Sequence, residues 1–175
     1  VYVRGHASDF DQWVDAGATG WGYADCLPYF KRGERWMGGG DTYRGGEGPV
    51  DTCNGNNMKN PLYTAFIAAG EEAGYGRTED YNGCRQEGFG PMHMTVRRGE
   101  RCSTDWAYLA PARKRPNFTV VTEAEVDTLV LSGKRVTGIR YQRRGEVNEV
   151  SARREVILSA GSIGSPAILQ RSGIG

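Results

Sequence analysis

The stretch of sequence that decides the fold runs from Glu155 to Gly175 and reads EVILSAGSIGSPAILQRSGIG. Its apolar run Val156-Ile157-Leu158 predicts a buried strand. A glycine turn over residues 160–164 follows this run. Ser165 is a good N-cap and Pro166 a good first helical residue, so we expect a short helix to follow and to end at Gly173. A glycine turn between a strand and a helix lets backbone N–H groups approach a phosphate or a cofactor closely.

The spacing of this turn leaves two interpretations open. Residues 160–164 contain Gly-x-x-Gly, whereas the dinucleotide fingerprint is Gly-x-Gly-x-x-Gly. By spacing alone, a simple connection between a strand and a helix is the more common explanation, and contact with a cofactor is the less common one.

The rest of the chain predicts short helices first and strands later. Helices are expected over four segments: 9–16, 23–34, 60–73 and 104–113. The third is the strongest, because Asn60 can cap it, Pro61 suits its first turn and Gly74 ends it. Further strands are predicted over 118–122, 125–131, 135–143 and 147–158, the last three as an antiparallel meander. The fold class is therefore α+β.

Residues 36–49 are rich in glycine and have no periodicity. Loops of this length without secondary structure are usually disordered or functional lids. We therefore expect a long surface loop between the second helix and a short strand that begins near Pro49.

Composition excludes several classes of function. The 175 residues carry 22 Lys and Arg against 21 Asp and Glu, which argues against electrostatic binding of nucleic acid. No apolar run is long enough to span a membrane. Cys26, Cys53, Cys84 and Cys102 lie far apart without a Cys-x-x-Cys pair, so we expect reduced thiols and no metal site.

Both ends of the chain predict an internal piece of a longer protein. Val1-Tyr2-Val3 opens in an apolar, strand-like run without an initiator Met, and Gly175 directly follows the last predicted helix. Natural termini are usually polar and loosely attached.

The residue types of the last stretch are more specific than its spacing. The pattern Gly161-Ser162-x-x-Ser165-Pro166-x-Ile168-Leu169-x-x-Ser172-Gly173-Ile174-Gly175 resembles the second signature of the glucose-methanol-choline (GMC) oxidoreductases, a family of FAD-dependent alcohol oxidoreductases. Val1–Gly5 is similar to the end of the first family signature. Further segments that resemble family landmarks are 9–13, 20–23, 26–31 and 45–49. Within the family, 86–92 and Met94-Thr95 are most similar to the choline-oxidising members.

The resemblance covers essentially the whole chain and implies the middle portion of a GMC flavoenzyme. It implies a flavin-proximal segment with its following helices over 1–35, a lid loop and the start of a substrate domain over 36–100, and a segment of the FAD-binding domain over 101–175. That last segment would contain the meander and a final strand and helix.

The resemblance also implies the contacts with FAD. Val1 and Tyr2 would lie near the flavin ring, Val126 would contact the adenine through its backbone, and Ala160 and Gly161 would lie against the dinucleotide.

The chain lacks two parts of the family pattern. It has neither the Gly-x-Gly-x-x-Gly fingerprint nor the segment that supplies the catalytic His. Its two histidines, His6 and His93, match neither motif, so we expect both to be structural or surface residues. We therefore expect no catalytic residue in this chain.

The activity implied by the resemblance is the oxidation of choline to betaine aldehyde by hydride transfer to FAD. Electrons would pass to a respiratory-chain acceptor, from a cytoplasmic protein that associates peripherally with the inner membrane. One alternative is another GMC alcohol dehydrogenase acting on an aliphatic or aromatic alcohol. An alternative of a different class is a non-enzymatic, β-rich binding module without flavin.

Overall fold

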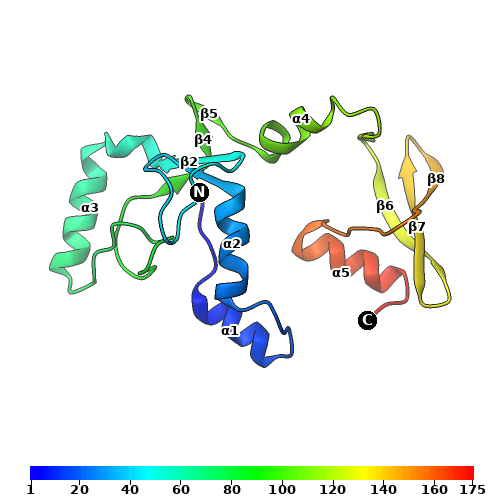
Figure 1. Ribbon diagram of the computed structural model, residues 1–175, viewed down its shortest axis with the longest axis horizontal. Helices are drawn as coiled ribbons and strands as arrows, with labels where there is room; N and C mark the ends of the chain where they lie inside the picture. Colours follow the sequence, from blue (N-terminus) through cyan, green and yellow to red (C-terminus); the bar gives the residue numbers. More distant parts are fainter. The chain divides into compact units, whose positions relative to one another are not determined.

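The computed structural model describes residues 1–175 except for the side chains of Asn56 and Asn57 (Figure 1). The chain divides into two compact units, Val1–Phe118 and Thr119–Gly175. The division into 1–35, 36–100 and 101–175 concerns the whole flavoenzyme and stays a prediction.

The first unit contains the three main helices expected from the sequence. They are α1 (Ala7–Asp15), α2 (Tyr23–Gly33) and α3 (Pro61–Glu72). Phe10 on α1 is buried and packs edge-on against Tyr23 and Phe30 of α2, with ring centroids 5.8 and 5.9 Å away. These aromatic contacts fix the two helices to each other.

The start of α3 is the one that its sequence predicts. The Oδ1 atom of Asn60 accepts a hydrogen bond of 3.0 Å from the backbone N–H of Leu62, which satisfies one free donor of the first turn. The buried positions of this helix are Ile67 and Gly70. The ring of Phe89 lies where a side chain at residue 70 would have to be, so glycine allows this close approach.

Short strands connect the helices of the first unit. β1 (Glu34–Trp36) pairs in parallel with β2 (Val50–Asn54), and β2 pairs antiparallel with β3 (His93–Met94). β4 (Val96–Arg97) and β5 (Glu100–Arg101) form a small hairpin. A 3-10 turn (Gly55–Met58) follows β2, and a π-helical turn (Asp105–Leu109) leads into α4 (Ala110–Ala112), where the fourth helix was predicted.

The prediction of a surface loop over 36–49 is wrong for its second half. Arg44, Gly45 and Gly48 are buried, and a Cβ atom at Gly45 would be too close to the carbonyl oxygens of Lys31 and Glu34. The glycines therefore let this segment pack directly against the end of α2 and the start of β1. Glycine content alone could not separate such close packing from a solvated loop.

The second unit consists of a meander and one helix. β6 (Glu125–Ser132), β7 (Arg135–Arg143) and β8 (Glu146–Ser151) form the predicted antiparallel sheet in the order β6-β7-β8. The helix α5 (Gly161–Arg171) packs on β6 (Figure 1). Ser172 joins them, because its Oγ atom accepts from the backbone N–H of Leu129 at 2.8 Å. Leu129 and Ile168 form the small buried core.

Three details of the predicted second unit are wrong. Residues 118–122 and 155–159 form no strand, and Ile157 is exposed, because no described segment pairs with them. The final helix begins at Gly161 rather than after Ser165, and Pro166 lies inside it. Pro166 is the sixth residue of this helix, past the N–H groups that lack an intrahelical partner, so α5 lacks one backbone hydrogen bond there.

Among the described residues, no helix is both long and apolar enough to cross a membrane. All four cysteines are free.

Candidate functional site

The start of α5 is an open backbone turn. Gly161 has φ +83°, and a Cβ atom there would meet nothing within 4 Å. Ala160 is the N-cap and supplies no side-chain cap, so N–H groups of the first turn remain for another partner. A left-handed glycine with free space beside it, at a helix N-terminus, fits a negatively charged group that approaches the backbone closely.

Val126, the predicted adenine contact, lies on β6 beside the C-terminal end of α5. The guanidinium of Arg171 donates to the carbonyl oxygens of Asp127 at 2.8 Å and Val126 at 3.1 Å. Gly161 begins α5, which has 11 residues and is thus ~16 Å long, and Val126 is hydrogen-bonded to the last residue of that helix. Contacts near both ends of a helix suit an extended ligand such as FAD.

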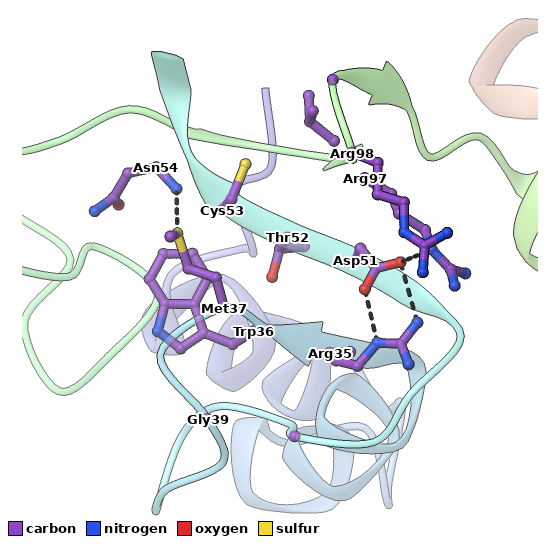
Figure 2. Close-up of a pocket in the computed structure, with 13 residues that line it drawn as sticks. Arg35, Trp36, Met37, Gly39, Asp51, Thr52, Cys53, Asn54, Arg97 and Arg98 are labelled. Carbon is purple, nitrogen blue, oxygen red and sulfur yellow. Dashed lines mark hydrogen bonds and ion pairs between the residues drawn. The ribbon is translucent and has the colours of Figure 1, made fainter. Parts of the chain in front are cut away.

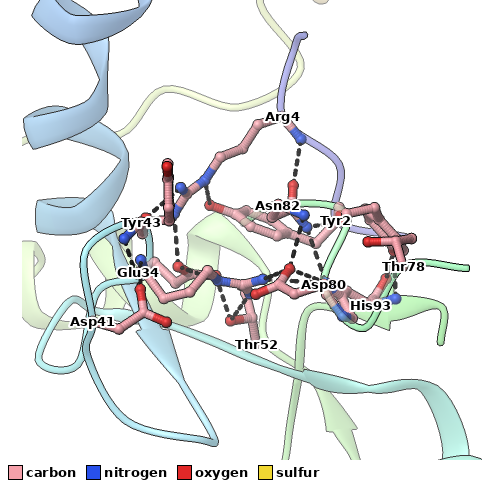
Figure 3. A network of polar contacts seen from close by, with 12 residues as sticks. Tyr2, Arg4, Glu34, Asp41, Tyr43, Thr52, Thr78, Asp80, Asn82 and His93 are labelled. Carbon is pink, nitrogen blue, oxygen red and sulfur yellow. Dashed lines mark hydrogen bonds and ion pairs between the residues drawn. The ribbon is translucent and has the colours of Figure 1, made fainter. Parts of the chain in front are cut away.

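The predicted flavin-proximal residues lie in the first unit. Val1 is exposed, whereas Tyr2 is half-buried and donates its backbone N–H to the carbonyl of His93 at 2.8 Å. Figure 3 shows Tyr2 and Arg4 as part of a dense polar network that also contains Asn82 and His93. The structure therefore places Val1 and Tyr2 in one unit, and Val126, Ala160 and Gly161 in the other.

An ionic cluster lies at the centre of this network (Figure 3). The carboxylate of Glu34 pairs with Arg4 at 2.7 Å and with Arg44 at 2.6 Å. Its Oε1 atom also accepts from the hydroxyl of Thr52 at 2.7 Å. A second carboxylate, that of Asp80, pairs with the Nη1 atom of Arg44 at 2.7 Å. Two guanidinium groups thus face two carboxylates, so the buried charges are compensated.

His93 is completely buried beside this cluster. Its Nδ1 atom faces two groups that can only donate, the Nη1 atom of Arg44 at 3.2 Å and the Nδ2 atom of Asn82 at 3.0 Å. We therefore assign the proton to Nε2, which has no hydrogen-bond partner among the described residues. Burial, and next the charge of Arg44, lower the pKa of His93 from 6.5 to about 4.

The two histidines differ in their surroundings. The ring of His93 lies between Tyr81 and Trp36, at centroid distances of 4.3 and 4.7 Å. His6 is exposed and caps α1, because its Nδ1 atom accepts from the backbone N–H of Ser8 at 3.2 Å.

A cavity of about 930 Å³ lies between β1, β2 and the β4–β5 hairpin (Figure 2). Its one carboxylate, that of Asp51, is already paired with Arg35 at 2.6 Å and Arg97 at 3.3 Å. One face of its aromatic ring, that of Trp36, is covered by the guanidinium of Arg44 at 4.0 Å. The carboxylate that would attract an organic cation is therefore already paired, and we assign no substrate to this cavity.

Sequence reasoning missed the polar residues that position the first unit, namely Glu34, Arg44 and Asn82. From the sequence, each of these residues is expected to be exposed to solvent, near a helix end or in a loop. The one local signal was Gly45, directly after Arg44, which allows the backbone to approach Lys31 and Glu34 closely.

Comparisons with known proteins identify the family. Residues 1–175 match GMC oxidoreductase. The chain is 58% identical to an oxygen-dependent choline dehydrogenase of Photobacterium profundum and 51% identical to one of Sinorhizobium fredii, over 100% of this chain in both cases. It covers only 31% and 32% of those two proteins, so it spans about a third of the length of these curated relatives.

Solved structures agree with this match. A pyridoxine 4-oxidase from Mesorbium loti has a TM-score of 0.88 at 38% identity, over 99% of this chain and 34% of its own. An FAD-dependent oxidoreductase from Chaetomium thermophilum has a TM-score of 0.89 at 27% identity, over 99% of this chain and 32% of its own. The α+β class with its antiparallel meander is thus the fold of a GMC flavoenzyme segment, and this chain belongs to the GMC oxidoreductase family.

Proposed function

We propose that this chain forms part of an FAD-dependent dehydrogenase that oxidises choline to betaine aldehyde. The observation that carries this proposal is an identity of 51–58% to choline dehydrogenases along the whole chain. The same likeness does not favour a β-rich binding module without flavin.

The residues of the chain fit a role in holding FAD. Gly161 and the free N–H groups at the start of α5 suit the pyrophosphate, with Ala160 beside them, and the backbone of Val126 suits the adenine. Val1 and Tyr2 would lie near the flavin ring. When bound, FAD accepts the hydride that leaves the alcohol carbon. No residue of this chain is proposed as the base that removes the hydroxyl proton.

The electron acceptor and the cellular location are the finer part of the proposal. We propose a respiratory-chain acceptor and a cytoplasmic protein that associates peripherally with the inner membrane. The curated relatives carry the words "oxygen-dependent" in their names. Choline-driven oxygen uptake by the pure protein, with one H₂O₂ formed per choline, would indicate direct reaction with oxygen. Uptake that requires added membranes would support a respiratory acceptor.

The second candidate is a GMC dehydrogenase that acts on an aromatic or aliphatic alcohol. The likeness to a pyridoxine 4-oxidase favours it, because pyridoxine is an aromatic alcohol. The test is to compare kcat/KM of the full-length protein for choline, benzyl alcohol, pyridoxine and butanol with an artificial electron acceptor. The proposal predicts that choline is preferred and that betaine aldehyde is the product. A preference for any of the other three alcohols would replace choline as the substrate while leaving the family unchanged.

A further inference from the structure

We propose that Asn82, supported by Gln86, is a positioning residue that holds segment 2–4 in the extended conformation in which it faces the flavin. This inference rests on the proposed function, because the flavin contact of Val1 and Tyr2 is part of that proposal.

Side chains, rather than a neighbouring strand, hold most of the backbone of this segment. The Oδ1 atom of Asn82 accepts from the backbone N–H of Arg4 at 2.8 Å, and its Nδ2 atom donates to the carbonyl of Tyr2 at 3.1 Å. The Nε2 atom of Gln86 donates to the carbonyl of Arg4 at 2.6 Å. With the bond from Tyr2 N–H to the carbonyl of His93 at 2.8 Å, all four backbone polar groups of residues 2 and 4 have partners.

The amide of Asn82 is itself fixed. The residue is only 2% exposed, its backbone N–H donates to Asp80 Oδ1 at 2.8 Å, and its Nδ2 atom lies 3.0 Å from His93 Nδ1. Because Asp80 also binds Arg44 at 2.7 Å, the amide bridge is attached to the buried ionic cluster (Figure 3). A partner fixed in this way determines where the bound backbone lies, rather than following it.

The bridge also determines which side chains segment 2–4 presents. Successive side chains of an extended segment point to opposite faces. Tyr2 and Arg4 point into the polar network, whereas Val1 and Val3 are 76% and 56% exposed. The exposed face of this segment, formed by Val1 and Val3, is therefore apolar. Its position depends on the amide side chains of Asn82 and Gln86. Loss of either amide should shift that face without removing any group from the cofactor itself.

The test uses the full-length flavoenzyme with the variants Asn82→Leu and Gln86→Met, which remove the amides at nearly constant size. The matched controls are Asn148→Leu and Gln142→Met in the second unit. Asn148 makes only a local bond to the carbonyl of Glu146, and Gln142 is exposed. For each protein, the FAD content, the visible spectrum of the bound flavin, and kcat and KM for choline are measured.

We expect Asn82→Leu to retain FAD, to change the flavin spectrum and to lower kcat by roughly 10- to 100-fold, because a displacement of about 1 Å can cost that much. KM should change far less. Gln86→Met should change the spectrum and kcat in the same direction but less, because it removes one bond. The controls should match wild type.

Each other result has a defined meaning. A flavin spectrum and kcat equal to wild type in both variants would overturn the inference. If Asn82→Leu does not fold, Gln86→Met decides: a changed spectrum supports the inference and an unchanged one overturns it. Wild-type protein without FAD would overturn the proposed function and this inference together. FAD that choline cannot reduce would overturn only the substrate, since the flavin spectrum of the variants still tests the role of Asn82.

Discussion

Glu34 and Arg44 form an ion pair that is completely shielded from solvent, with 2.6 Å between Oε1 and Nη2 and both side chains 0% exposed. Arg4 shares the same carboxylate at 2.7 Å. Glu34 belongs to β1, Arg44 to the glycine-rich segment and Arg4 to the segment proposed to face the flavin. One carboxylate thus joins three parts of the first unit.

Removing this carboxylate should strongly destabilise the protein. Glu34→Gln leaves the guanidinium groups of Arg4 and Arg44 buried with less compensating charge. We expect the free energy of unfolding to fall by about 3–5 kcal/mol, as for other broken buried pairs. Chemical denaturation of wild type and variant measures the difference.

The matched control is Glu149→Gln. Glu149 pairs with Arg140 at 3.4 Å, and both side chains are about half exposed (48% and 50%). Exposed pairs contribute about 1 kcal/mol or less, so this variant should resemble wild type. Equal stability of the two variants would mean that the buried cluster does not stabilise the fold.

The close packing of the glycine-rich segment gives a second prediction. Gly45→Ala places a methyl group against the carbonyl oxygens of Lys31 and Glu34. Because backbone atoms must shift, we expect a loss of about 1–3 kcal/mol. Gly33→Ala is the control: its nearest neighbour would be the Tyr108 hydroxyl at an ordinary 3.5 Å. Thermal unfolding should show a lower Tm only for Gly45→Ala; equal Tm values would contradict the packing described.

The buried imidazole predicts a dependence of stability on pH. Since burial and Arg44 lower the pKa of His93 to about 4, the unfolded chain binds a proton between about pH 6.5 and pH 4 that the folded chain does not. Stability is therefore lost as the pH falls through this window. From about pH 7 to about pH 5, His93 should account for a loss of about 2 kcal/mol.

The variants His93→Gln and His6→Gln isolate this effect. His93→Gln cannot titrate, so its stability should fall less between these two pH values than that of wild type. His6 is exposed, and its variant should retain the wild-type pH dependence even if the lost cap lowers stability. An unchanged pH dependence in His93→Gln would contradict a buried, neutral His93.

Two glycines in the left-handed conformation give a matched pair for the cofactor site. Gly161 begins α5, and Gly74 follows the end of α3 in the first unit. Their φ angles are +83° and +86°, and a methyl group added at either residue would meet no atom within 4 Å. Alanine should therefore strain both backbones to a similar extent. We expect Gly161→Ala to weaken FAD binding at least about tenfold, a loss of about 1.4 kcal/mol, and Gly74→Ala to leave it unchanged. Equal affinities, measured by FAD titration of deflavinated protein, would place the cofactor elsewhere.

Caps and turns could be predicted from the sequence, because they depend on residues that are adjacent in the chain. Asn60-Pro61 predicted the start of α3, and the turn around Gly133 predicted the β6–β7 hairpin. The run 156–158 is different, because a strand needs a hydrogen-bonded neighbour and no described segment supplies one.

The polar network could not be predicted for a related reason. Arg4 and Asn82 are 78 positions apart, and neither carries a local pattern that indicates burial. Their contact follows from the packing of distant segments. The family resemblance identified candidate cofactor contacts, whereas the residues that hold those contacts in place became apparent only from distances.

The most direct test of the proposed function is to mix the full-length protein anaerobically with choline and to follow the absorbance of its flavin. We predict that the purified protein contains FAD, that choline bleaches its visible band, and that one betaine aldehyde forms per flavin. Protein that contains no FAD, or FAD that stays oxidised in the presence of choline, would contradict the proposed function.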